Sequence, residues 1–275
     1  MPLSLTGFVP QYERICPGNP ALGSASLLPW DAEIFGFPVG SFEIGAERLD
    51  EVLEKEFSAR FLAWAKRHGI RLCMCAIPAA NSWWKLALAA AGFSFVDFAL
   101  QARLNELQTA RLPEPRTALR DVEAGEWEAI EAIAEHAFHF GRFHADPLFP
   151  RELADLRYRR WIRNARAALS VSNRVFAMGE PGAVQGFYHV FINGGDSDLR
   201  LAALRPDLQG TMLGFDLYVS VLHSLKGLGV RRVQTSISAG NTSVMNVYSM
   251  LGFSFSRAEA IYHWHSTSAF GRAAE

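Results

Sequence analysis

The sequence predicts a mixed α/β protein made of two related halves, of which the first is truncated. Three observations lead to this fold class: an internal repeat, alternating helix and strand signals within each copy, and a globular composition. Of the 275 residues, 49% are hydrophobic and 20% are charged. A chain of this length and apolarity forms one large domain or two modest ones, and it is not disordered.

The repeat appears when the sequence is shifted against itself by 160 residues. Residues 69–95 then align without a gap with residues 229–255, and nine of the 27 positions are identical. Each copy predicts a helix that ends at a glycine, a strand, a short helix capped by Asn81 or Asn241, and a strand that begins Gly-Phe-Ser-Phe. The common unit is therefore α-β-α-β.

The remaining elements follow from periodicity and turn signals. Helices are expected at about 47–67 and 211–227, ahead of the two copies. Residues 104–117 are expected to be a linker because they carry two prolines and little periodicity. The second half adds strands at 118–122, 174–178, 184–192 and 198–204 and helices at 126–138 and 150–165, and two strands in all are expected after the short helix of the second copy. We expect an N-terminal domain at 1–108 and a C-terminal domain at 109–275.

The charge balance excludes several classes of partner. With 27 basic and 28 acidic side chains, the formal charge of −1 provides no general attraction for nucleic acid or an anionic membrane. No run of 18 apolar residues is present, and the first 14 residues do not resemble a secretory signal. The three cysteines are too few for a disulfide framework, and Cys73 and Cys75 are expected to be buried thiols. We expect a cytoplasmic protein with no nucleic-acid or membrane partner.

A loop followed by a long amphipathic helix gives the strongest functional signal. The strand that ends at Leu204 leads through Pro206 into Gln-Gly-Thr-Met-Leu-Gly (209–214), which opens the helix. Free backbone N–H groups and the helix dipole at such a start suit a pyrophosphate, and Gly210 and Gly214 allow close approach. Many strand–glycine–helix turns bind nothing, so the residues alone leave both alternatives open.

This segment resembles the phosphate loop of the GNAT superfamily of acyl-CoA-dependent N-acetyltransferases, Gln/Arg-Gly-x-Gly-x-Gly/Ala after a strand. Met212 departs from that pattern because it stands where the family usually has its middle glycine. The resemblance implies a fold of two GNAT-like halves and acetyl-CoA, or another short acyl-CoA, as co-substrate without a metal. It also implies a set of donor-binding residues: Ala202, Ala203, Leu204, Gln209, Gly210, Thr211, Met212, Leu213, Gly214 and Asn241.

A second segment strengthens the resemblance. Asn241, Tyr248 and the following Leu-Gly-Phe are similar to the family's Asn…Tyr…Gly-Phe segment. The resemblance implies that Asn241 contacts the acyl-pantetheine arm and that Tyr248 is the catalytic acid that protonates the departing thiolate. The first copy has Leu88 in place of Tyr248 and no Gln-Gly-x-Gly-like loop. We therefore interpret it as a degenerate half without a donor site of its own.

The tandem arrangement narrows the resemblance to the TDP-fucosamine acetyltransferase type, the nucleotide-amino-sugar N-acyltransferases. Supporting segments are the aromatic-rich residues 28–40 and the segment 141–165. The resemblance implies acyl transfer to the amine of a TDP-type deoxyamino sugar, as in surface polysaccharide biosynthesis, with 141–165 beside the acceptor. Arg142 and His144 are candidate substrate-binding residues for its phosphates, since a guanidinium forks onto phosphate oxygens; ordinary surface residues are the equal alternative.

Several further readings are weighed against this one. His136, His139 and His144 lie close in sequence, with the first two expected on one helix face, but no complete metal-ligand set is evident. His189 is one candidate for the general base, beside a water chain or a backbone carbonyl. The alternative functions are an acetyltransferase for a protein, peptide or small amine, and a non-catalytic acyl-CoA sensor. The sequence leaves the oligomeric state open, a homodimer included.

Overall fold

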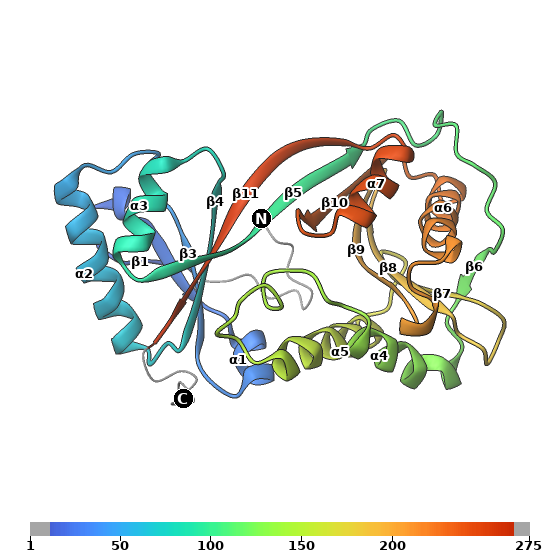
Figure 1. Cartoon of the computed structure of the whole chain (residues 1–275), viewed down its shortest axis with the longest axis horizontal. Coiled ribbons are helices and arrows are strands. Elements are labelled where there is room, and N and C mark those ends of the chain that lie inside the picture. Colours follow the sequence, from blue (N-terminus) through green and yellow to red (C-terminus); the bar gives the residue numbers. More distant parts are fainter. Residues whose placement is uncertain (1–11, 267–275) are drawn as a thin grey trace. The chain divides into compact units, whose positions relative to one another are not determined.

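The computed structural model describes residues 12–266 and divides into two compact units. The N-terminal unit consists of the described residues 12–99, 141–153 and 258–266. The C-terminal unit consists of residues 100–140 and 154–257. Each unit has its own part of the sheet and its own hydrophobic packing (Figure 1).

The N-terminal unit contains a mixed sheet with helices packed on it. Its strands follow the order β1-β2-β3-β4-β11, with β3 parallel to β4 and β11 antiparallel to β4. Its elements are β1 (Glu13–Arg14), η1 (Pro20–Leu22), β2 (Ser24–Leu27), α1 (Pro29–Phe35), β3 (Val39–Glu43), α2 (Glu51–Arg67), β4 (Leu72–Pro78), α3 (Ser82–Ala90) and the start of β5 (Phe93–Leu104).

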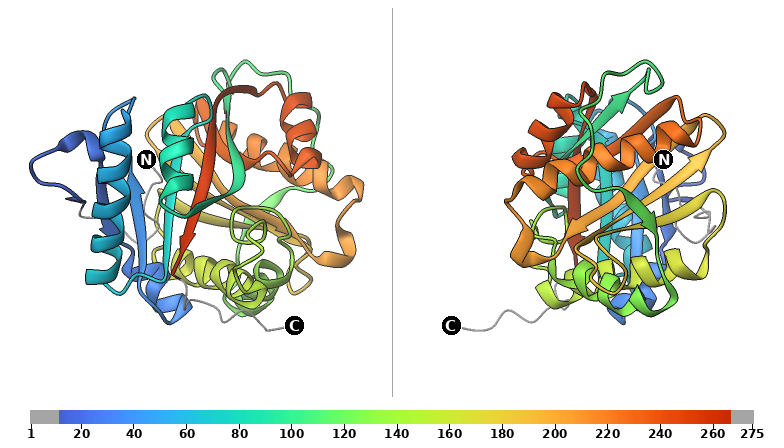
Figure 2. Two further views of the ribbon diagram at one scale, coloured as in Figure 1. Left: turned by 60° about the vertical axis from the view of Figure 1, so that its left-hand side comes forward. Right: turned by 90° about the vertical axis from the view of Figure 1, so that its right-hand side faces the viewer.

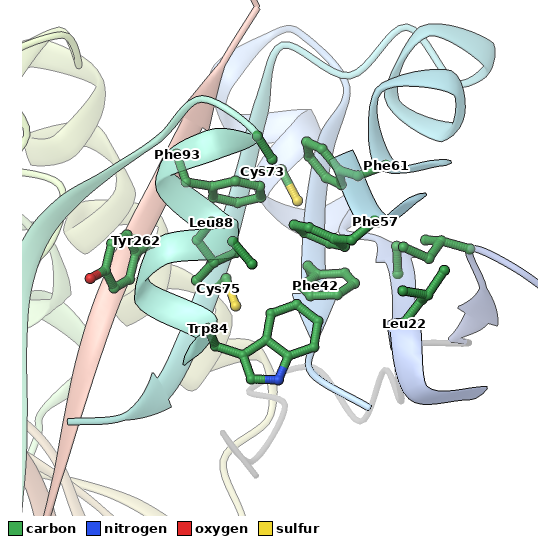
Figure 3. Packing of buried hydrophobic residues seen from close by; sticks show 14 of the residues in the cluster. Leu22, Phe42, Phe57, Phe61, Cys73, Cys75, Trp84, Leu88, Phe93 and Tyr262 are labelled. Carbon is green, nitrogen blue, oxygen red and sulfur yellow. The ribbon is translucent and has the colours of Figure 1, made fainter. Parts of the chain in front are cut away.

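An aromatic core joins α2 and α3 to one face of this sheet. Phe42 of β3 lies 5.1 Å from Phe57 of α2, centroid to centroid, and 5.7 Å from Trp84 of α3 (Figure 3). The thiols of Cys73 and Cys75, both fully or almost fully buried, belong to the same core, as expected. The periodic apolar positions of the two helices therefore explain their packing on the sheet.

The C-terminal unit has a sheet with a separate core on each face. Its strands follow the order β10-β9-β8-β7-β6, antiparallel except for the pair β9 and β10. One core involves α6 and α7, and the other involves α4 and α5. The elements are β6 (Leu119–Asp121), α4 (Trp127–His136), α5 (Arg151–Ala167), β7 (Asn173–Met178), β8 (Gly186–Asn193), β9 (Asp196–Leu204), α6 (Met212–Gly227), β10 (Arg232–Ser238), α7 (Thr242–Met250) and β11 (Ser254–His265).

The structure confirms the repeat as two α-β-α-β sequences, α2-β4-α3-β5 and α6-β10-α7-β11. Asn81 and Asn241 cap α3 and α7, because their side-chain oxygens accept hydrogen bonds from the N–H groups of Trp84 and Val244. The glycines that end the helices have positive φ, for example +61° at Gly69. The local signals in the sequence are therefore sufficient for these turns.

The last strand of each repeat contributes residues to both units. β5 has residues 93–99 in the N-terminal unit and 100–104 in the C-terminal unit, and β11 crosses in the opposite direction at residue 258. Both strands have 12 residues, which corresponds to about 40 Å, and both run as long continuous strands (Figures 1 and 2). The compact units are thus interleaved in sequence, and the sequential division at residue 108 remains a prediction.

The structure corrects two expectations. The two strands expected after the short helix of the second copy are a single strand, β11. The helix α4 ends at His136, so His139 lies beyond the helix and the two histidines do not share a helix face. The segment 105–118 is irregular, as expected of a linker, and it is held in place because the carboxylate of Asp216 in α6 accepts hydrogen bonds from the backbone N–H groups of Arg116 and Thr117. The buried carboxylate supplies the acceptors that this irregular backbone needs.

No helix among the described residues is both long enough and apolar enough to cross a bilayer. The expectation about a secretory signal concerns the chain's first 14 residues, of which 1–11 lie outside the described residues.

Candidate active site

The parallel strands β9 and β10 separate after a short paired segment. Their register covers Asp196 to Asp198 of β9 and Arg232 to Gln234 of β10, although β9 has nine residues. On its other side, β9 stays paired with β8 as far as Leu204. The main chain of β9 beyond Leu199 therefore has one unpaired edge, toward β10. Such an edge offers N–H and C=O groups to an extended ligand, in the manner of an added strand.

A bulge in β9 sets the direction of the side chains along this edge. His189 of β8 faces Leu201 and Val190 faces Leu199, so Arg200 is the extra residue. Leu199 consequently packs in the core beneath α6 and α7, whereas Leu201 packs in the core beneath α4 and α5. The change of face keeps apolar side chains buried on both sides while the strand continues to Leu204.

Three hydroxyl groups meet where the strands separate. The hydroxyl of Thr235 in β10 donates a hydrogen bond to the carbonyl oxygen of Leu199, at 2.9 Å. Tyr248 of α7 is hydrogen-bonded to Thr235, and its oxygen lies 3.3 Å from the phenolic oxygen of Tyr188 in β8. The phenol of Tyr248 is thereby held at the start of the unpaired edge of β9.

Tyr248 remains protonated throughout the neutral pH range. Burial raises its pKa to about 12, against its hydrogen bonds with Tyr188 and Thr235, which lower it. Its side chain is 4% exposed, and its ring packs edge-on against Tyr218, at 5.2 Å between centroids. A neutral phenol of this kind is a proton donor.

The predicted phosphate loop begins α6 as expected. Gly210 has a φ of +74°, and no heavy atom lies within 4 Å of the position that a Cβ would take. The hydroxyl of Thr211 caps the helix by accepting a hydrogen bond from Leu213 N–H. The side-chain amide of Gln209 donates to the carbonyl oxygen of Ala137, which ties the loop to the end of α4. Met212 is 64% exposed.

The first repeat shows why the corresponding site in the N-terminal unit is closed. Strand β3 pairs with β4 over four of its five residues, so the two strands do not separate. The indole N–H of Trp84 donates to the carbonyl of Ala46, and the side-chain amide of Asn81 donates to the carbonyl of Glu47. These bonds occupy two backbone carbonyl groups of the loop ahead of α2 with side chains of the protein itself.

Charge also distinguishes the two loops. Extending the 160-residue shift places Asp50, Glu51 and Glu54 at the positions of Gly210, Thr211 and Gly214. Carboxylates at the first turn of a helix stabilise it through the dipole, but they repel a phosphate. The start of α6 has no acidic residue in its first turn. Only the second loop is therefore suited to a pyrophosphate.

Not every predicted site residue lies in the C-terminal unit. Arg142 and His144 belong to the N-terminal unit, whereas the phosphate loop, Asn241 and Tyr248 belong to the C-terminal unit. Arg142 lies over the ring of Phe143, 5.1 Å from its centroid. The assignment of Arg142 and His144 to the acceptor remains a prediction.

His189 is unsuited to act as a general base. Its Nδ1 accepts a hydrogen bond from the indole N–H of Trp161, and its Nε2 donates to the side-chain oxygen of Asn173. The ring is fully buried, and desolvation together with the charge of Arg200 lowers its pKa to about 3. Both ring nitrogens are occupied, so this imidazole is a structural hydrogen-bonding group in the core.

Sequence reasoning missed Tyr188, Tyr218 and Thr235. Tyr188 lies in a segment with the pattern of an ordinary strand, and Tyr218 lies in one with the pattern of an ordinary helix. Thr235 lies on a strand of the second copy, at the position that aligns with Cys75 of the first copy. The repeat carries a weak signal for the cluster, because the second copy has Tyr248 where the first has Leu88 and Thr235 where the first has Cys75. Only the packing brings these hydroxyls together.

Comparison with solved structures shows which fold the chain has. No family model matches the chain. It resembles a GCN5-related N-acetyltransferase from Sphaerobacter thermophilus (14% identity, TM-score 0.64, covering 89% of this chain and 76% of that one). It also resembles a tandem GNAT protein from the clavulanic acid biosynthesis pathway (16%, TM-score 0.57, 88% and 78%) and a GCN5-related N-acetyltransferase from Kribbella flavida (13%, TM-score 0.59, 94% and 91%).

The chain thus has the GNAT fold in a tandem arrangement, as the sequence resemblance implies. Among curated proteins, it is 25% identical over 144 residues to the spore coat polysaccharide biosynthesis protein SpsD of Bacillus subtilis strain 168. That alignment covers 51% of this chain and 48% of SpsD, so the chain matches about half the length of this relative.

Proposed function

We propose that the protein is an acyl-CoA-dependent N-acyltransferase whose donor site lies in the C-terminal unit. The observation that carries the proposal is the separation of β9 from β10. The phenol of Tyr248 lies where the two strands separate, and the N-terminus of α6, which suits an anion, follows the C-terminal end of β9. The GNAT fold supports the same reaction class.

The residues present fit acetyl-CoA or another short acyl-CoA. The unpaired main chain of Ala202–Leu204 would hydrogen-bond the pantetheine arm, and the backbone N–H groups of Gln209–Gly214 would hold the pyrophosphate. The capping oxygen of Asn241 is used by Val244, which leaves its amide N–H₂ to contact the acyl-pantetheine arm. Bound acyl-CoA supplies an activated acyl group as a thioester.

The transfer step is a direct displacement. A neutral acceptor amine forms a C–N bond to the thioester carbonyl carbon, the C–S bond breaks, and the amine nitrogen loses a proton to a base. Tyr248 donates its phenolic proton to the departing sulfur, and the phenolate is then reprotonated. Because the pKa of Tyr248 is raised to about 12, the residue carries this proton at every neutral pH value.

We propose a nucleotide-linked deoxyamino sugar as the acceptor. The resemblance to nucleotide-amino-sugar acyltransferases and the partial similarity to a polysaccharide biosynthesis protein support this substrate class. The proposed cytoplasmic location and the proposed phosphate contacts of Arg142 and His144 belong to the same hypothesis.

A screen of acceptors tests this assignment. The purified protein is incubated with acetyl-CoA and TDP- or UDP-linked amino sugars, and free CoA is measured with a thiol reagent. Peptides and polyamines are tested in parallel under the same conditions. CoA release with nucleotide amino sugars is the expected result, whereas release only with peptides or polyamines would assign the protein to the alternative acyltransferase class.

A non-catalytic acyl-CoA sensor is the second candidate, favoured by the 4% exposure of the Tyr248 side chain. A sensor would bind acyl-CoA in a calorimetric titration without releasing CoA with any acceptor. An enzyme would bind it and release CoA with at least one amine class.

A further inference from the structure

A buried cluster of two histidines and an aspartate lies in the N-terminal unit, which contains none of the proposed donor-site residues; its aspartate belongs to the same segment as Arg142 and His144. Oδ2 of Asp146 lies 2.7 Å from Nδ1 of His263 and 2.7 Å from Nε2 of His265. Asp146 is 4% exposed, and His263 is completely buried. One donor atom from each residue lies within 4.8 Å of the others, so the three side chains converge on a single point.

The alternation of side chains along β11 puts the imidazoles of His263 and His265 on one face of the sheet. His263 and His265 are two residues apart and face Met74 and Leu72 of β4, whereas Tyr262 and neighbouring Trp264 pack on the opposite face with α2 and α3. The strand therefore gives each histidine a fixed direction. Rigid backbone of this kind is the support that a metal site requires.

Asp146 is brought to the histidines by the segment 141–149. Phe143 and Phe149 of this segment pack against Phe35 of α1, at 5.5 and 4.9 Å between ring centroids. The other carboxylate oxygen, Oδ1, accepts a hydrogen bond from the backbone N–H of Leu148, which fixes the orientation of the carboxylate. An outer hydrogen bond of this kind is typical of a ligating carboxylate.

We propose that Asp146, His263 and His265 bind one divalent transition-metal ion, with Zn²⁺ as the best match. Two imidazole nitrogens and one carboxylate oxygen form a donor set that Zn²⁺ favours. Metal–ligand distances of about 2.0–2.2 Å put neighbouring donors about 3.3 Å apart, so the present contacts would open by about 0.6 Å. That change is within the reach of side-chain adjustment.

The two nitrogen atoms that would bind the metal, Nδ1 of His263 and Nε2 of His265, must carry no proton. When the metal takes Nδ1 of His263, the proton moves to Nε2 of the same ring. Nε2 is buried and has no hydrogen-bond partner within residues 12–266, so this tautomer shift breaks no existing bond of that nitrogen. Three protein ligands leave one coordination position for water.

Zinc binding by the untagged full-length protein tests the proposal. The protein is stripped with a chelator, dialysed, and titrated with Zn²⁺ in competition with a chromophoric chelator. We expect one Zn²⁺ per chain, and a loss of affinity of at least about 100-fold in His265→Gln and in Asp146→Asn. His136→Gln, which removes an exposed histidine outside the cluster, is the matched control and is expected to bind as the parent does.

Folding of the variants is checked by circular dichroism, and Co²⁺ absorption spectra of the parent protein give an independent readout. Tetrahedral d–d bands that are absent in folded His265→Gln support the site. No stoichiometric binding by the parent protein, or equal affinity in the parent and in folded His265→Gln, would overturn the proposal and leave the cluster as a hydrogen-bonded clasp between β11 and the 141–149 segment.

Discussion

Tyr248 has surroundings that suit a proton donor better than a base. Its neighbours are two further tyrosines and a threonine, and no described charged side chain is hydrogen-bonded to its phenol. Desolvation therefore raises the pKa and keeps the proton on the oxygen. Under the proposed function, a hydrogen bond from such a group would stabilise the departing thiolate of CoA in the transition state.

Replacing Tyr248 by phenylalanine removes this proton and keeps the ring packing. We expect kcat to fall by about 10²–10⁴-fold, the usual contribution of a general acid. Binding of acyl-CoA, measured by calorimetry, is expected to change little. Tyr218→Phe is the matched control, because Tyr218 packs edge-on against Tyr248 within the same cluster. Unchanged turnover in Tyr248→Phe would contradict the acid role.

Glu126 illustrates how a single residue stabilises the C-terminal unit. Its carboxylate accepts two hydrogen bonds from the guanidinium of Arg120 and one each from the backbone N–H groups of Glu123 and Gly182. The hydrogen bonds from Arg120 are the main cause that lowers the pKa of Glu126 to about 2. A bidentate pair of this kind is geometrically specific as well as strong.

Glu126→Gln is expected to lower the free energy of unfolding by about 3 kcal/mol at pH 7, from a pKa shift between 4.5 and about 2. Because the pKa is lowered on folding, this stabilisation is fully present above pH 4.5 and is lost as the pH falls toward 2. Urea titrations at pH 7, 4 and 2.5 measure the difference between parent and variant. A difference that stays constant with pH would contradict the charge-based account.

At the scale of elements, the two repeats differ in strand pairing: β3 pairs with β4 along four of its five residues, whereas β9 pairs with β10 along only three of its nine. The loops that follow β9 and β3 differ in charge at the helix start. The N-terminal unit closes its loop with Trp84 and places carboxylates at the first turn of α2. The same element order therefore yields one loop suited to an anion and one loop that the protein's own groups occupy.

Gly210→Ala tests the loop directly. The φ of +74° is unfavourable for alanine, and a Cβ would project where the pyrophosphate approaches. We expect the KM for acyl-CoA to rise by about tenfold or more, which corresponds to roughly 1.4 kcal/mol.

Gly182→Ala is the control for backbone strain. Gly182 has a φ of +76° and the same open surroundings, but it lies in the turn between β7 and β8. The Gly182→Ala variant is expected to destabilise the fold about as much as Gly210→Ala does and to leave the KM for acyl-CoA unchanged. A KM that rises equally in both variants would show that strain, and not the loop, is responsible.

At the scale of the whole molecule, the interleaving of β5 and β11 makes each compact unit depend on residues from both repeats. The N-terminal unit takes Tyr262 of β11 into its hydrophobic core and pairs β11 with β4 along seven residues. Without that strand, β4 has an unpaired edge and its core is open to water.

Expression of the fragment 109–275 tests this dependence. In the full chain, Tyr262 and Trp264 pack against the core of the N-terminal unit, so the fragment exposes them. We expect an aggregating or poorly soluble product, checked by size-exclusion chromatography and circular dichroism beside the full chain. A soluble, folded monomer would instead support two sequentially independent domains divided at residue 108.

Local signals in the sequence determined the fold class, the repeat and most element bounds, because caps, glycines and apolar periodicity act over a few residues. Asn241 as a helix cap and Gly210 as a turn glycine follow from such signals, whereas Tyr248 was predicted from the family resemblance; all three lie in one unit of the structure. The tertiary structure alone decided which hydroxyls surround Tyr248 and that the last strand of each repeat serves both units. It also decided that Asp146 meets histidines 117 and 119 residues away. Such contacts depend on chain topology and strand register, which no short pattern of residues encodes.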